Sequence, residues 1–263
     1  MLLARALTGA ALLAAFLAAV LLLERAAFAA VVALIVMLGG YEWGRLCALR
    51  RSPAALYAAA CLALFASFPG GDLTPVLWGA ALFWVLLVPW WLAHGVTPRA
   101  RAWLLAAGLM ALVPAGLAMA AMPPWLLLTT MGLVWLADTF AYVAGRAFGR
   151  RKLAPSISPG KSWEGVAGGA AACLIYAIIC AMLNADLGGR VSGAIWVPYL
   201  AGAMLLCAAS IIGDLLESAL KRQAGAKESG ALLPGHGGVM DRIDSATAAL
   251  PLALLLAQSA GIA

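Results

Sequence analysis

One predicted helix face carries the residue types that phosphate and metal chemistry requires. The residues are separated by four, three, one and three positions, and they are Ser210, Asp214, Glu217, Ser218 and Lys221. This spacing places all of them on one side of an α-helix. Two acids near the end of an apolar helix are costly unless they face a cavity, a metal ion or charged partners. The face therefore indicates either an ion-pair network, with Lys221 and Arg222 as the cations, or a binding site.

A glycine-rich segment follows this helix and reads LPGHGGVMDRID. The glycines around His236, including Gly237 and Gly238, allow close backbone approach, and free N–H groups of this kind can hold a phosphate. Asp241 and Asp244 then stand three residues apart at the start of the last predicted helix. They are either capping and dipole partners of that helix or ligands of a divalent cation bound to phosphates.

A second polar segment begins with Asp138, an acid within another apolar run, and continues as FGRRKLAPSISPGKSWEG. Its first basic residues suit lipid headgroups, and these are Arg150, Arg151 and Lys152. That interpretation leaves the compact SPGKSWEG unexplained, where Lys161 and Glu164 flank the start of a helix. Its GKS is not a nucleotide-binding P-loop, because the glycine that such a loop requires upstream is absent.

These polar segments interrupt a chain whose composition is that of a membrane protein. Of its 263 residues, 65% are hydrophobic and only 11% are charged, against about 25% charged in a soluble domain. The net charge of +6 does not indicate nucleic-acid binding here, because basic residues typically hold membrane loops on the cytoplasmic side. The five cysteines form no CxxC pair, so we expect small apolar residues instead of disulfides or a zinc site.

The apolar runs predict an all-α, polytopic integral membrane protein with about nine transmembrane helices. The first run is expected to be a retained helix and not a cleaved signal peptide, because Glu24 and Arg25 interrupt the cleavage region. The nine predicted spans are Ala6–Leu23, Ala26–Tyr41, Ala54–Phe68, Pro75–Leu92, Ala102–Ala121, Pro124–Val143, Gly165–Leu183, Ala194–Leu216 and Asp244–Ile262.

The distribution of basic residues predicts a cytoplasmic N-terminus. With that orientation, only Arg25 and Arg190 of the 17 basic residues fall on the outer side. The polar chemistry is concentrated after Trp135. We therefore expect residues 1–123 to be an apolar, lipid-facing scaffold and residues 124–263 to be the catalytic region. Its two cytoplasmic loops are 145–164 and 217–244.

The segment Ser218–Asp244, SALKRQAGAKESGALLPGHGGVMDRID, resembles the signature of phosphatidate cytidylyltransferases, also called CDP-diacylglycerol synthases. That signature is S-x-x-K-R, four residues, K-D, and then P-x-H-G-G-x-x-D-R-x-D. The upstream stretch DTFAYVAGRAFGRRKLAPSISPGKSWEG is also similar to this family. The chain departs from the pattern at two positions, since Glu228 replaces an aspartate and Gly160 replaces a lysine.

The resemblance implies that CTP and phosphatidic acid react to give CDP-diacylglycerol and diphosphate. It implies Mg²⁺ as the cofactor, and a second, monovalent cation such as K⁺ is compatible with it. It also implies a homodimer in the inner cell membrane, with its active site facing the cytoplasm. The expected metal ligands are Asp214, Asp241 and Asp244. The expected catalytic residues are these three with Lys221 and Arg222. The expected substrate-binding residues are Lys161, Glu164, Asp138, Lys227, His236, Gly237, Gly238 and Arg242.

Three other functions are weighed against this one. A transporter predicts acids at the bilayer midplane and inverted repeats, and no repeat is visible. A CTP-dependent membrane kinase acting on a polyprenol or similar alcohol would require a base to remove a hydroxyl proton. A structural membrane subunit would leave both polar segments unexplained.

Overall fold

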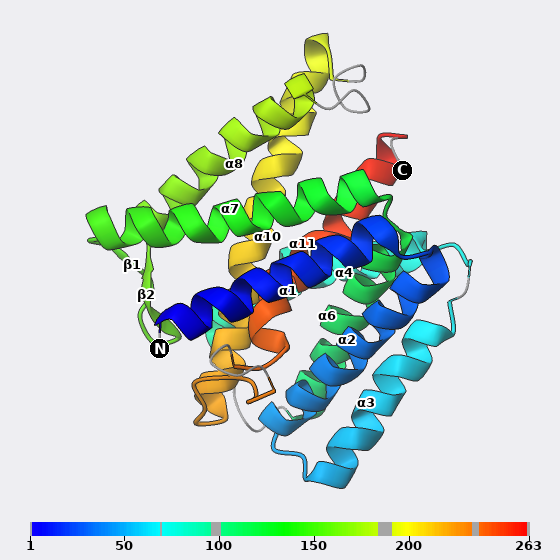
Figure 1. The fold of residues 1–263 in the computed structure, drawn as a ribbon. Helices are drawn as coiled ribbons and strands as arrows, with labels where there is room; N and C mark the ends of the chain where they lie inside the picture. Colours follow the sequence, from blue (N-terminus) through cyan, green and yellow to red (C-terminus); the bar gives the residue numbers. More distant parts are fainter. Residues whose placement is uncertain (1, 69, 96–100, 184–190, 233–236, 262–263) are drawn as a thin grey trace.

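The computed structural model describes residues 2–68, 70–95, 101–183, 191–232 and 237–261, and these are mostly helical (Figure 1). The helices of the first half are α1 Leu2–Leu22, α2 Arg25–Leu46, α3 Arg51–Ala66, α4 Thr74–Leu82, the π-helical turn η1 Phe83–Leu87, α5 Val88–His94 and α6 Arg101–Ala121. Those of the second half are α7 Pro124–Phe148, α8 Trp163–Leu183, the 3₁₀ turn η3 Gly193–Ile195, α10 Trp196–Gln223 and α11 Met240–Ser259.

Within the described residues, six helical segments are long and apolar enough to cross a membrane. They are Arg25–Leu46, Thr74–His94, Arg101–Ala121, Pro124–Phe148, Trp163–Leu183 and Gly193–Gln223. Thr8–Leu22 and α3 are apolar but shorter. Over the described residues, each of the nine predicted spans overlaps with helical residues, so the protein is an all-α membrane protein in its main architecture. The number of nine crossings and the cytoplasmic N-terminus stay predictions.

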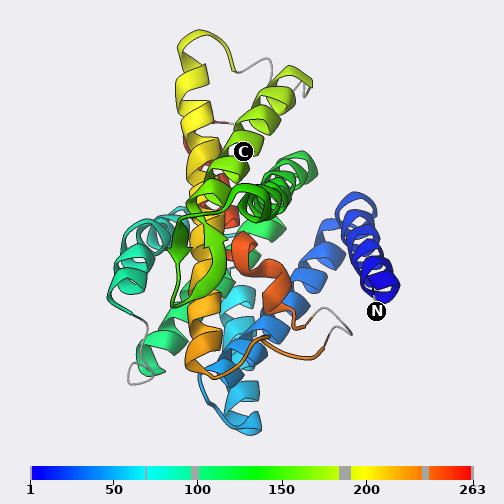
Figure 2. The same ribbon diagram turned by 90° about the vertical axis from the view of Figure 1, so that its left-hand side faces the viewer.

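Helix α11 is the central element of the bundle. It packs against α10 on one side and against α6, α4 and α7 on the others. Its residues from Ser245 to Leu255 are buried without interruption, as expected for a helix enclosed by others. Figure 2 shows α1 at the edge of the molecule, where Phe16 makes an edge-on ring contact with Trp135 of α7. At the start of α11, Asp241 and Asp244 are therefore partly buried and Ser245 is buried.

Helices α7 and α8 pack closely because small residues line their contact. A Cβ atom on Gly165 would lie 2.7 Å from the Ala141 carbonyl oxygen, and one on Gly169 would lie 2.8 Å from the Ala137 carbonyl oxygen. Small residues permit such close backbone approach between membrane helices. The contact matters for the site because α7 carries Asp138 next to Ala137.

Gly169→Val is expected to lower the thermal midpoint of the detergent-purified protein, because the side chain must force α8 away from the Ala137 carbonyl. Overpacking of this kind costs about 1–3 kcal/mol. Gly160→Val is the control, since no atom lies within 4 Å of a Cβ at Gly160. Equal midpoints for the two variants would contradict the packing described here.

The segment between α7 and α8 contains a small hairpin that the all-α prediction did not include. Strand β1, Lys152–Ala154, pairs antiparallel with β2, Ser158–Ser162. A turn joins them, in which Ile157 N donates to the Ala154 carbonyl at 3.1 Å and Pro155 takes the second position, a position that favours proline. Strands this short show no alternating pattern, so the sequence indicated only a loop.

Candidate active site

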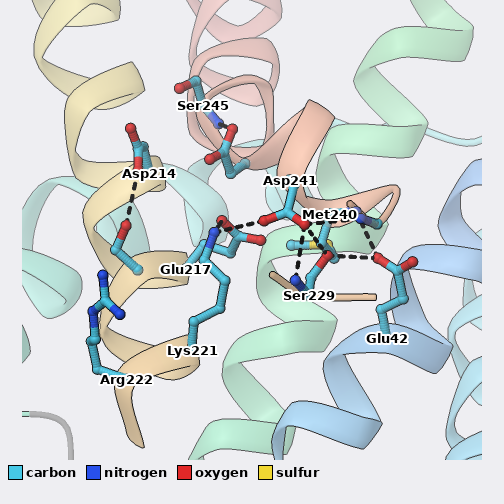
Figure 3. Close-up of polar contacts among 12 residues, drawn as sticks. Glu42, Asp214, Glu217, Lys221, Arg222, Ser229, Met240, Asp241 and Ser245 are labelled. Carbon is cyan, nitrogen blue, oxygen red and sulfur yellow. Dashed lines mark hydrogen bonds and ion pairs between the residues drawn. The ribbon is translucent and has the colours of Figure 1, made fainter. Parts of the chain in front are cut away.

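The polar face of α10 is built around Lys221 (Figure 3). Its Nζ lies 2.6 Å from Glu217 Oε2, one helical turn away, and 2.7 Å from Asp241 Oδ1 at the start of α11. The Glu217 side chain is 1% exposed and that of Lys221 is 14% exposed. A buried carboxylate requires such a partner, so Lys221 joins the two helices while it neutralises two acids.

Asp214 lies further along the same face and connects α10 to the hairpin. Its Oδ2 lies 2.6 Å from Lys161 Nζ of β2, and its Oδ1 accepts a hydrogen bond from Ser218 Oγ at 3.1 Å. Arg222 adds a second link, because its Nε donates to the Ile157 carbonyl at 3.3 Å. Lys161, a predicted substrate-binding residue, and Arg222, a predicted catalytic residue, thus connect the hairpin to the acidic face of α10.

Two further acids complete the cluster. Asp138 of α7 accepts a hydrogen bond from Ser245 Oγ at 3.2 Å, and both Asp138 and Asp244 lie near enough to Asp214 to repel it electrostatically. Asp138, Asp214 and Asp244 therefore share one region of the bundle, with Lys161 as the cation placed there. Three carboxyl groups with one lysine among them provide oxygen ligands for an additional cation at this place.

Asp241 orders the loop that precedes α11. Its Oδ2 accepts hydrogen bonds from Ser229 N at 2.9 Å, Ser229 Oγ at 3.0 Å and Gly238 N at 2.9 Å. Gly237 has a φ of +74°, which favours glycine. A Cβ there would also collide with Asp241 Oδ2. Both oxygens of Asp241 are thus bonded to the protein, and His236 lies outside the described residues.

The remaining predicted substrate-binding residues lie at the periphery. Glu164 accepts hydrogen bonds from the backbone N–H groups of Arg150, at 3.0 Å, and Arg151, at 3.2 Å. It therefore fixes the base of the hairpin in the structure. Lys227 and Arg242 are exposed at the end of the bundle that carries the loop, where a phosphate could reach them.

The predicted metal ligands are only partly brought together. Among the residues that the structure describes, no group of three His, Cys, Asp or Glu side chains is arranged to hold a metal ion. Mg²⁺ is typically bound through one or two carboxylates together with substrate phosphates and water. Asp214 and Asp244 fit that mode, because their two carboxyl groups lie close enough to interact electrostatically. A role for Asp241 as a third ligand stays a prediction.

Glu42 of α2 also belongs to this region, and the sequence analysis missed it. Its side chain is 3% exposed and contacts Ser229, Val239 and Met240. The second span was predicted to end at Tyr41, so Glu42 counted as a loop residue. One feature of the sequence could have identified Glu42, since it is an acid at the end of an apolar run and directly precedes the apolar Trp43.

The chain matches the model of the cytidylyltransferase family over residues 3–260 and belongs to this family. It is therefore an enzyme of the nucleotidyltransferase class. The membership covers both halves of the chain, including the N-terminal helices that the sequence motifs did not reach.

Curated relatives define the comparison further. A phosphatidate cytidylyltransferase of Pseudomonas aeruginosa is 41% identical over 273 residues, covering 98% of this chain and 97% of the relative. The enzyme of the same name from Haemophilus influenzae is 51% identical over 130 residues, covering 48% of this chain and 43% of the relative. That from Staphylococcus saprophyticus is 44% identical over 124 residues, covering 47% and 45%.

Proposed function

We propose that this enzyme transfers a cytidylyl group from CTP to phosphatidic acid and releases diphosphate. The observation that carries the proposal is the cluster of Asp138, Asp214 and Asp244 beside Lys161 and Lys221 inside a membrane bundle. It combines lysines that can meet phosphates with carboxyl groups that can hold a cation, in a bundle whose helices are long and apolar enough to cross a membrane. The similarity along the full length of the Pseudomonas aeruginosa relative supports the same substrates.

The reaction requires positioning more than acid–base chemistry. A phosphate oxygen of phosphatidic acid forms a bond to the α-phosphorus of CTP, while the bond from that phosphorus to the bridging oxygen of diphosphate breaks. The nucleophile is already ionised at neutral pH, so no strong general base is needed. Charge neutralisation and alignment are then the main contributions of the protein.

The basic residues of the site would provide that neutralisation. Lys161 lies beside Asp214 in the cluster and Lys221 lies between Glu217 and Asp241, while Arg222, Lys227 and Arg242 are exposed. Because Lys161 and Lys221 now pair with carboxylates, we propose that they exchange these partners for phosphate oxygens when substrates bind. Gly237 and Gly238, with His236 of the preceding segment, would border the nucleotide.

Asp214 and Asp244, with Asp138 close by, would hold a divalent cation, for which Mg²⁺ is our proposal. Bound there, such an ion supplies positive charge against the phosphates of the nucleotide. Asp241 is the third proposed ligand if its loop rearranges. A second, monovalent cation such as K⁺ is compatible with the excess of carboxylates.

The proposed setting is the inner cell membrane. We propose nine crossings with the N-terminus and the site on the cytoplasmic side, residues 1–123 as a supporting region and residues 124–263 as the catalytic region. We also propose a homodimer. Reporter fusions at the loops would test the orientation, and the mass of the protein in detergent would test the assembly.

The reaction is tested by following label from CTP into lipid. The purified protein is incubated with phosphatidic acid, Mg²⁺ and CTP labelled at either the α- or the γ-phosphate. Label from the α-phosphate is expected in CDP-diacylglycerol, and label from the γ-phosphate is expected in diphosphate. Transfer of the γ-label to lipid would instead indicate a kinase, and no transfer of either label would overturn the proposal.

Removal of divalent cations is expected to stop turnover, and Mg²⁺ is expected to restore it. The cation site can also be measured without turnover, through the paramagnetic resonance of Mn²⁺ with CTP present and lipid omitted. Asp244→Asn is expected to weaken Mn²⁺ binding by at least about 10–100-fold, the range already seen when a residue that only supports a metal ligand is lost. Unchanged Mn²⁺ affinity would contradict the placement of the cation.

A further inference from the structure

Glu42 lies in the N-terminal half of the chain, yet its hydrogen-bond partners lie in the loop between α10 and α11 and at the start of α11. The side chain is only 3% exposed, near the C-terminal end of α2. The partners are 187 to 198 residues away in the sequence. An acid in such a place is costly unless its oxygens are fully used.

The two carboxylate oxygens are used by three donors. Glu42 Oε1 accepts from Val239 N at 3.0 Å, and Oε2 accepts from Met240 N at 2.9 Å and Ser229 Oγ at 2.9 Å. Val239 is the N-cap residue and Met240 the first residue of α11, so these N–H groups have no partner within the helix. A carboxylate is favoured at a helix N-terminus by the helix dipole and by charge-assisted hydrogen bonds.

Ser229 links Glu42 to Asp241. Its hydroxyl lies within hydrogen-bond distance of both carboxylates, 2.9 Å from Glu42 and 3.0 Å from Asp241, and its N–H donates to Asp241 at 2.9 Å. Gly238 lies between these groups. A Cβ there would collide with Ser229 Oγ and Glu42 Oε2. Only a glycine therefore fits at position 238 while Glu42 and Ser229 hold these positions.

We propose that Glu42 is a positioning residue of the active site. It holds the start of α11 and the segment around Ser229, so that Asp241 meets Lys221 and the neighbouring Asp244 faces α10. Glu42 contacts none of the reacting groups in this account. The proposal rests on the proposed function for its catalytic consequence, while the contact itself can be tested apart from activity.

Glu42→Gln is the most informative variant, because it keeps the size of the side chain. The amide nitrogen of glutamine would face either Val239 N–H or Met240 N–H. Because both groups are hydrogen-bond donors, one hydrogen bond would be lost. We expect kcat of cytidylyl transfer to fall by about 10–100-fold, as for residues that orient ligands. Val36→Ala is the matched control, since Val36 is 2% exposed on the same helix and lies outside the polar network. It is expected to lower the thermal midpoint and keep kcat.

A double-mutant cycle with Ser229→Ala separates positioning from general destabilisation. Residues of one network couple. We therefore expect Glu42→Gln with Ser229→Ala to lose no more kcat than the worse single variant. Val36→Ala with Ser229→Ala should show independent effects. The proposal would be overturned if the loss of kcat in Glu42→Gln with Ser229→Ala equalled the product of the two single losses. It would also be overturned if Glu42→Gln alone kept the wild-type kcat.

Hydrogen exchange gives a readout that does not depend on the reaction. Glu42→Gln is expected to speed amide exchange in peptides covering Ser229 and Val239–Asp241, while peptides from α8 stay at the wild-type rate. Unchanged exchange around Val239 would overturn the positioning role. An inactive wild-type protein with the expected exchange difference would instead overturn only the proposed function.

Discussion

Asp214→Asn is expected to reduce CTP-dependent formation of CDP-diacylglycerol by roughly 10³-fold, which corresponds to about 4 kcal/mol in the barrier. The substitution removes a negative charge from the place where we propose that the divalent cation binds, and metal ions contribute several kcal/mol to such reactions. Initial rates with purified protein in detergent, with CTP, Mg²⁺ and phosphatidic acid in excess, measure the loss.

The same variant is expected to stay folded. The Lys161–Asp214 pair is partly exposed, at 24% and 28% for the two side chains, and pairs of this kind contribute about 0–1 kcal/mol. Asp72→Asn is the control, because Asp72 is an exposed acid between α3 and α4. Near-normal rates in Asp214→Asn, or an equal loss in Asp72→Asn, would contradict the role assigned to Asp214.

Lys221→Met is expected to impair both stability and activity. It leaves Glu217, which is 1% exposed, without the cation that lies 2.6 Å from its Oε2, and it frees Asp241 from its contact with α10. Removal of one partner from a buried ion pair typically costs 3–5 kcal/mol. The thermal midpoint in detergent and the rate of cytidylyl transfer measure the two effects.

The double variant Lys221→Met with Glu217→Gln tells these effects apart. It removes the unpaired buried charge, so we expect it to recover much of the lost thermal midpoint. Activity is expected to stay low, because the cation proposed to meet the phosphates is still missing. If activity recovered together with the thermal midpoint, Lys221 would contribute to stability only and not to the reaction.

The sequence predicted the parts of the site that depend on local periodicity. Helical spacing was sufficient to place Asp214 and Lys221 on one face of α10, and the ion pair of Lys221 with Glu217 follows from a separation of four residues. Lys221 and Asp241 are 20 residues apart in the sequence, and the loop between α10 and α11 separates them. Helical periodicity does not extend across such a loop. The contact between Lys221 and Asp241 could therefore be found only in the structure.

Glu42 shows where periodicity was insufficient. Its contacts depend on the packing of α2 against the start of α11, and a prediction from hydropathy alone ends the span one residue before it. Asp241 shows a related limit. Its spacing from Asp244 indicated a pair of metal ligands, whereas the structure directs its oxygens to Ser229, Gly238 and Lys221. Both outcomes depend on loop conformation, which residue types alone do not determine.

The most direct test of the central claim is mass-spectrometric detection of the products formed by the purified wild-type protein from CTP and phosphatidic acid. We predict CDP-diacylglycerol and diphosphate in equal amounts, dependent on a divalent cation and nearly absent with folded Asp214→Asn. Failure of the folded wild-type protein to form CDP-diacylglycerol, or equal formation by Asp214→Asn, would contradict the assignment of lipid cytidylyl transfer to this site.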